Sequence, residues 1–125
     1  MTEGLKTWRS ALNLGGAVAF SEPVLLGAPS DATLAFWEEY PQITDLDGIT
    51  SRVEAAGYRV QTHRMIVGEP WRAYYTPMQA RIDMLRNQEP DGELQAALDE
   101  NQQEIDRWRA APEQIAYALL IVKPV

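Results

Sequence analysis

The apolar run near the end of the chain, residues 115–122, constrains the fold more than any other stretch. Its residues alternate between two sets that are both apolar: Ile115, Tyr117, Leu119 and Ile121 in one, and Ala116, Ala118, Leu120 and Val122 in the other. A strand that is apolar on both faces needs cover on both faces, as in the sheet of an α/β protein. The run therefore predicts a central strand with a neighbouring strand on each side.

Another apolar strand is expected at residues 16–21, after the pair Gly15-Gly16. Small or apolar side chains occupy both of its faces, which again indicates an α/β sheet. Pro23 lacks an amide N–H, so the sequence Ser21-Glu22-Pro23 predicts the end of this strand. Glu22 is then expected at the carboxyl end of the strand, where open α/β sheets bind their ligands.

Residues 58–67 predict a further strand, in which polar and apolar side chains are mixed on both faces. This pattern is typical of a half-exposed strand at the edge of a sheet. Because the last strand needs a partner on each side, the expected order is first, last, second. The prediction is a three-stranded mixed sheet of order 1-3-2, whose last strand is central and antiparallel.

Helical spacing and capping residues predict about five helices around this sheet. Leu5, Trp8 and Leu12 mark the buried face of the first helix. The helices are expected at residues 2–12, at 32–40 after an Asp31 N-cap, from Asp45 or Asp47 to Gly57, from an N-cap at Thr76, and at 92–110. A chain of 125 residues fits one domain, so residues 1–125 are taken as a single α/β domain.

Composition excludes several classes of function. The 18 acidic residues outnumber the 11 basic ones, for a net charge of −7, which argues against a nucleic-acid partner. Without cysteine and with His63 as the single histidine, the chain offers no disulfide, no thiolate zinc site and no multi-histidine metal site. No run has the length of a membrane span or the apolar core of a signal peptide, so a cytoplasmic location is expected by default.

Two sets of residues are candidates for binding a substrate. Glu22 could accept a hydrogen bond or act as a base, or it could be a solvated loop acid. An aromatic set could line a pocket for a small apolar or planar molecule, or pack the helices onto the sheet; it consists of Trp37, Tyr40, Trp71, Tyr74 and Tyr75. No residue is assigned a catalytic role.

The chain resembles the C-terminal part of class I S-adenosylmethionine-dependent methyltransferases at four places. Residues 12–16, Leu-Asn-Leu-Gly-Gly, look like the family's Leu-Lys-Pro-Gly-Gly turn into its fifth strand, and Ser21-Glu22-Pro23 is similar to the acidic end of that strand. Residues 55–58, Ala-Ala-Gly-Tyr, resemble the step into the sixth strand, and residues 117–123 resemble the central seventh strand. The resemblance implies half of a Rossmann-like methyltransferase fold.

The chain departs from the family in ways that bear on activity. Asn13-Leu14 stands where Lys-Pro is usual, and the Gly-rich loop that binds the methyl donor is missing. Gly15-Gly16 precedes a strand rather than opening a helix, so it is not such a loop. The complete enzyme would use S-adenosylmethionine, but this chain alone is expected to bind neither that cofactor nor a metal. Whether the chain is a fragment, one half of a split enzyme or a module without catalysis stays open.

The resemblance implies an acceptor-side segment of a methyltransferase, and the alternative is a non-catalytic interaction and dimerisation module. Both interpretations use the edge of the strand at residues 16–21. In the complete family fold another strand covers that edge, whereas here it is expected to be bare. The expected partner is therefore the missing N-terminal half or a second copy of the chain. A small-molecule acceptor is a further expected partner, and a membrane is not.

Overall fold

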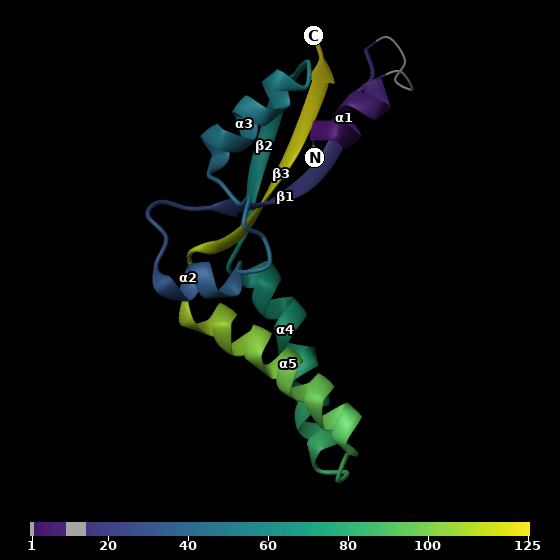
Figure 1. Cartoon of the computed structure of the whole chain (residues 1–125), viewed down its shortest axis with the longest axis vertical. Coiled ribbons are helices and arrows are strands. Elements are labelled where there is room, and N and C mark those ends of the chain that lie inside the picture. Colours follow the sequence, from purple (N-terminus) through teal and green to yellow (C-terminus); the bar gives the residue numbers. More distant parts are fainter. Residues whose placement is uncertain (1, 10–14) are drawn as a thin grey trace. The chain divides into compact units, whose positions relative to one another are not determined.

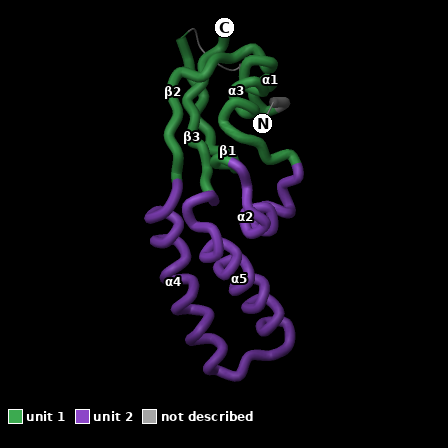
Figure 2. The backbone as a smooth tube through the Cα atoms, turned by 90° about the vertical axis from the view of Figure 1, so that its left-hand side faces the viewer, with its two compact units in different colours: residues 1–27, 42–66, 116–125 green, residues 28–41, 67–115 purple. Residues whose placement is uncertain are grey.

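The computed structural model describes residues 2–9 and 15–125, and its elements follow in α/β order (Figure 1). They are α1 (Thr2–Arg9), β1 (Val18–Leu25), α2 (Asp31–Phe36), α3 (Leu46–Ala55), β2 (Tyr58–Val67), α4 (Glu69–Arg86), α5 (Gly92–Ala110) and β3 (Ile115–Pro124). The chain divides into two compact units (Figure 2). Unit 1 comprises residues 1–27, 42–66 and 116–125, and unit 2 comprises residues 28–41 and 67–115.

The sheet of unit 1 has the predicted order, β1-β3-β2, with β3 in the centre and antiparallel to both neighbours. Since both pairs of adjacent strands are antiparallel, the sheet is antiparallel rather than mixed. One face of β3 is completely buried, through Ala116, Ala118, Leu120 and Val122. The opposite face, with Tyr117, Leu119 and Ile121, is only half-buried. The prediction of a central strand is confirmed, but the cover on its two faces is unequal.

Helices α1 and α3 lie on the same side of this sheet (Figure 2). Leu5 of α1 and Val53 of α3 are fully buried, and the Tyr58 hydroxyl of β2 donates a hydrogen bond to the Leu5 carbonyl oxygen. The prediction that Trp8 faces inward is wrong, because its side chain is 49% exposed. The remaining predicted contact of this helix, Leu12, lies outside the described residues.

Strand β1 differs from the prediction at both ends. It begins at Val18 and continues through Glu22 and Pro23 to Leu25, so Pro23 does not end it. Proline is tolerated in a strand at the edge of a sheet, where its missing N–H faces away from the ladder. Beyond Pro23, the Leu25 N–H donates to the Thr44 carbonyl at 2.9 Å. That bond keeps the chain extended where a loop would otherwise be expected.

Unit 2 contains α2, α4 and α5. The predicted helix at 92–110 is confirmed as α5, and its N-cap Asp91 accepts a hydrogen bond from the Leu94 N–H at 2.8 Å. The predicted helix start at Thr76 is wrong, since α4 begins at Glu69 and runs through Pro77. Thr76 lies inside the helix instead, and its hydroxyl donates to the Arg72 carbonyl at 2.8 Å.

Polar contacts join α2 to α5 and to the segment that follows α5. The Arg107 guanidinium donates to the Ala35 carbonyl at 3.1 Å and to the Glu38 carboxylate at 2.7 Å. The Gln114 side-chain oxygen accepts hydrogen bonds from the hydroxyls of Ser30 and Thr33. Ser30, and not the predicted Asp31, caps α2, which ends at Phe36 rather than near Tyr40. The end of α2 is thereby held within unit 2.

Candidate functional site

Glu22 does not lie at the end of its strand, so the geometric basis for its predicted role is wrong. Three residues of β1 follow it, and its side chain is half-buried. Within the described residues its carboxylate has no hydrogen-bond or ion-pair partner. Glu22 belongs to unit 1. Its role as a substrate contact stays a prediction.

The five aromatic candidates all belong to unit 2, where the structure brings them together. The segment that follows α2 supplies Trp37 and Tyr40, and the first half of α4 supplies the other three. Neighbouring rings lie in contact along one path, with centroid separations of 5.3 Å for Tyr40–Trp37, 6.2 Å for Trp37–Trp71, 6.2 Å for Trp71–Tyr75 and 5.1 Å for Tyr75–Tyr74. Most of these pairs meet edge to face, the arrangement that ring quadrupoles favour.

Burial divides this aromatic path into two kinds of residue. Trp37, Trp71 and Tyr75 are buried, so they form the core of unit 2. Tyr40 and Tyr74 are 49% and 60% exposed, respectively. Only these two therefore offer an accessible ring and hydroxyl to a molecule in solution.

Two residues of α5 contact Tyr75 and were not among the sequence candidates. The Trp108 ring lies 5.3 Å from the Tyr75 ring, and the Glu104 carboxylate accepts a hydrogen bond from the Tyr75 hydroxyl at 2.9 Å. The signal was present in the sequence, since Glu104 and Trp108 are four residues apart and so share a helix face. The indole N–H of Trp108 is buried and has no hydrogen-bond partner among the described residues.

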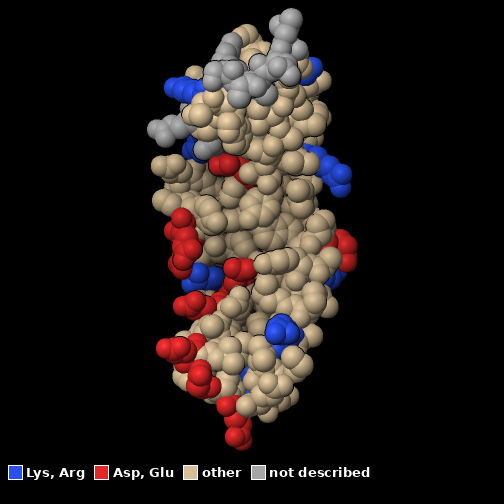
Figure 3. All heavy atoms as spheres, turned by 90° about the vertical axis from the view of Figure 1, so that its right-hand side faces the viewer, with Lys and Arg blue, Asp and Glu red and all other residues tan. Residues whose placement is uncertain are grey.

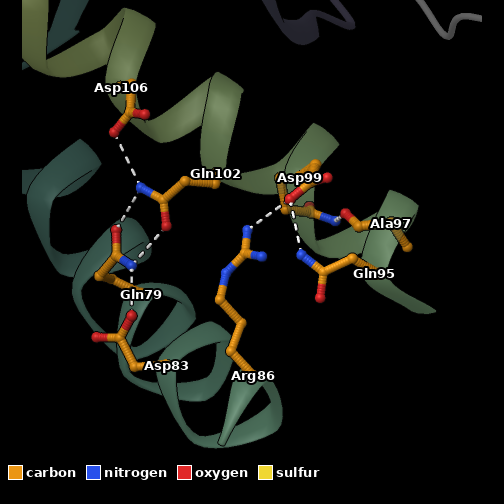
Figure 4. Close-up of polar contacts among 9 residues, drawn as sticks. Gln79, Asp83, Arg86, Gln95, Ala97, Asp99, Gln102 and Asp106 are labelled. Atoms are coloured by element: carbon orange, nitrogen blue, oxygen red, sulfur yellow. Dashed lines mark hydrogen bonds and ion pairs between the residues drawn. The ribbon is translucent and has the colours of Figure 1, made fainter. Parts of the chain in front are cut away.

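A polar hollow of about 390 Å³ lies on α4 and α5. Figure 4 shows polar contacts in and beside it: the side-chain amides of Gln79 and Gln102 bind each other at 2.7 and 2.9 Å, and Arg86 pairs with Asp99 at 2.9 Å. These bonds join the two helices to each other. Acidic groups line the hollow, but no cluster in the described part of the chain has the residues to hold a metal ion.

The distribution of charge fits the acidic composition. Figure 3 shows acidic side chains gathered along one margin of the face in view, and no comparable gathering of basic ones on that face. A nucleic-acid-binding surface would show clustered lysine and arginine. None of the helices in the described residues is both long and apolar enough to cross a membrane.

The described residues do not fit a methyl-donor site of the family's type, which needs a glycine-rich turn between a strand and a helix. Gly15 has a positive φ of 80° but leads into β1. Gly68, with a φ of 77°, does join β2 to α4. However, Glu69 and Pro70 follow it, so the start of α4 carries an acid and lacks an N–H.

Comparison with known proteins gives a clear result at the level of the fold. No family model and no curated protein matches the sequence. The whole chain (100%) aligns with 52% of a SAM-dependent methyltransferase from Geobacter sulfurreducens, solved in complex with S-adenosyl-L-homocysteine, at a TM-score of 0.79 and 15% identity. The chain has the fold of about half of a SAM-dependent methyltransferase.

Two further structures agree. A SAM-dependent methyltransferase from Thiobacillus denitrificans, also with S-adenosyl-L-homocysteine, aligns over 100% of this chain and 52% of its own, at a TM-score of 0.80 and 15% identity. YJHP from E. coli aligns over 89% of this chain and 50% of its own, at a TM-score of 0.66 and 19% identity. The chain thus spans about half the length of each, and the predicted resemblance is confirmed as a likeness of fold.

Proposed function

We propose that this chain is the acceptor-side segment of a SAM-dependent methyltransferase and does not bind the methyl donor by itself. The observation that carries the proposal is the alignment of the whole chain with 52% of two methyltransferases. The absence of a fitting glycine turn among the described residues agrees with it. S-adenosylmethionine is then the cofactor of the complete enzyme, bound mainly by the other half.

In this proposal Tyr40 and Tyr74 contact the methyl acceptor, because they are the exposed members of the aromatic path. A phenol presents an apolar ring and a hydroxyl, which together suit a small planar acceptor. The buried residues Trp37, Trp71 and Tyr75 fix the positions of the two exposed rings. Glu22, in unit 1, is a separate candidate for accepting a hydrogen bond from the acceptor.

The reaction implied is a direct displacement. A lone pair of the acceptor attacks the methyl carbon of the sulfonium donor, and the carbon–sulfur bond breaks as the new bond forms. The sulfur leaves as a neutral thioether and the acceptor releases a proton. Little covalent chemistry falls to the protein, so this chain contributes by positioning the acceptor.

Calorimetric titration of the chain with S-adenosylmethionine tests the claim about the donor. We expect no measurable binding, because the described residues offer no loop for the donor. Micromolar affinity of the isolated chain would overturn the proposal.

A non-catalytic dimerisation module is the second candidate, and the exposure of β1 favours it. β1 is an edge strand, and Ala19 and Ser21 on it are exposed. Exposed strand edges pair readily with other strands, including those of a second copy. Light scattering at high protein concentration tests this function, and a monomer would contradict it.

A further inference from the structure

Tyr75 lies where several aromatic rings of unit 2 meet. Its ring contacts those of Trp71, Tyr74 and Trp108, at centroid separations of 6.2, 5.1 and 5.3 Å, respectively. Electrons pass readily between aromatic rings in contact, because their π systems overlap. Since Tyr74 is 60% exposed and Tyr75 is buried, the two rings connect the surface of unit 2 to its core.

The Tyr75 hydroxyl has a partner that can take its proton. It donates a hydrogen bond to the Glu104 carboxylate at 2.9 Å. An ionised carboxylate only accepts hydrogen bonds, and bonds to such charged acceptors are among the strongest in proteins. Glu104 is itself exposed. A proton that leaves the buried phenol for Glu104 can therefore pass on to water.

This proton acceptor distinguishes Tyr75 from the neighbouring indole of Trp108. Removal of one electron from an indole or a phenol leaves a radical cation, and a buried charge without a partner is costly. The Trp108 N–H is buried and has no hydrogen-bond partner among the described residues, so no base is in place to receive its proton. At Tyr75 the proton moves to Glu104, and the oxidised ring is neutral. An electron vacancy on these rings is therefore expected to come to rest on Tyr75.

We propose that Tyr75 is a one-electron redox site, which an oxygen-centred radical in solution oxidises through Tyr74 and whose proton Glu104 accepts. This inference goes beyond the proposed function and does not depend on it. The class of oxidant follows from the donor, because a phenol gives up an electron only to a strong one-electron oxidant. The burial of the Tyr75 ring keeps the resulting phenoxyl radical from coupling with a second copy of the chain.

The atoms and electrons of the step balance. A peroxyl radical takes one electron from the Tyr74 ring and one proton from water, and leaves as a hydroperoxide. Tyr74 regains an electron from Tyr75, as the Tyr75 O–H bond breaks and the proton passes to the Glu104 carboxylate. The products in the protein are a neutral phenoxyl radical and a neutral carboxylic acid, which releases its proton to water. A thiol or ascorbate in solution restores the phenol by returning one electron and one proton.

Photochemical oxidation of the full chain tests the inference. Tris(bipyridine)ruthenium(III), generated by a light flash, serves as the one-electron oxidant. EPR spectroscopy detects the radical, and a narrower spectrum from a chain with ring-deuterated tyrosine assigns it to tyrosine. Tyr75→Phe should lower the yield of tyrosyl radical at least about tenfold, because no other ring in contact with Tyr74 has this proton acceptor. Tyr117→Phe, in unit 1, is the control and should leave the yield unchanged.

A pair of variants on α5 tests the role of Glu104. Glu104→Gln keeps an oxygen that can accept the hydrogen bond but does not take up the proton, so the yield should again fall at least about tenfold. Asp106→Asn is the matched control, because the Asp106 carboxylate accepts its hydrogen bond from Gln102 (Figure 4). Near-UV circular dichroism checks that each variant folds. If Glu104→Gln does not fold, the unsubstituted chain is oxidised in heavy water, where the reaction should be slower because a proton moves with the electron.

Four results would overturn the inference. The tyrosyl radical could form in Tyr75→Phe with the yield of the unsubstituted chain, or its yield could be equal in Glu104→Gln and Asp106→Asn. Heavy water could leave the rate of oxidation unchanged. Oxidation could also crosslink two chains through dityrosine, which would mean that the radical remains on an exposed ring such as Tyr74.

Discussion

Unit 2 buries Trp71, Tyr75 and Trp108, whereas the sheet of unit 1 leaves apolar side chains half-buried on one face. In unit 2, Trp71, Tyr75 and Trp108 pack on one another, and α2 is fastened to α5 through Arg107. In unit 1, Leu120 is fully buried on one face of β3, while Leu119 and Ile121 on the other face are not. The apolar side chains of unit 2 named here are therefore buried by the chain itself, whereas those on one face of β3 are buried only in part.

This difference separates residues that stabilise the chain strongly from residues that stabilise it less. Burial of apolar area contributes about 25 cal/mol per Å², so a fully enclosed ring contributes its whole area and a half-exposed side chain only part of it. Substitutions in the core of unit 2 should therefore be costly in the isolated chain. Substitutions of the half-buried Leu119 and Ile121 should cost less.

The largest expected effect comes from Trp71→Ala. The ring is buried and contacts Phe36, Trp37 and Tyr75, so its removal leaves a cavity in the core of unit 2. The free energy of unfolding should fall by about 3–5 kcal/mol. Urea denaturation followed by near-UV circular dichroism measures the change.

Tyr74→Ala is the matched control, because the adjacent Tyr74 is 60% exposed. Its cost should remain below about 1 kcal/mol, as for most exposed positions. Equal losses for the two variants would show that the burial of Trp71 does not stabilise unit 2 as described.

The next effect compares neighbours on opposite faces of β3. Leu120→Ala should destabilise the isolated chain by about 2–5 kcal/mol, as for other fully buried leucines. Leu119→Ala, at a half-buried position on the opposite face of β3, should cost about 1 kcal/mol. Urea denaturation of both variants gives the two losses, and equal losses would show that the two faces of β3 are covered alike.

The fold was predictable where the alternation of apolar residues in one stretch is enough to indicate a strand and its burial. The alternating apolar residues 115–122 predicted the central strand, and the order β1-β3-β2 followed from it. The local signals at two prolines were misleading. Pro23 reads as a strand end, yet the bond between Leu25 and Thr44 keeps the strand extended. Thr76-Pro77 reads as a helix start, yet α4 already begins after Gly68.

The candidate site was predictable in composition but not in exposure. Aromatic residues at 37–40 and 71–75 indicated a cluster, and the structure forms one in unit 2. Which rings are accessible depends on how α2, α4 and α5 pack, and spacing along one helix does not contain that information. Tyr75 illustrates the point, because its hydroxyl finds Glu104 on another helix and its ring is buried.

The smallest expected loss of stability is that of a variant in the polar contacts between α4 and α5. Arg86→Gln removes the ion pair with Asp99, whose carboxylate is 62% exposed and also accepts a hydrogen bond from Gln95 at 3.2 Å. Pairs as exposed as this one contribute about 0–1 kcal/mol, and salt screens them further. Urea denaturation at low and high salt should show a loss of less than about 1 kcal/mol that shrinks as salt rises. A loss as large as that of Trp71→Ala would mean that α4 and α5 depend on this polar contact as much as unit 2 depends on its aromatic core.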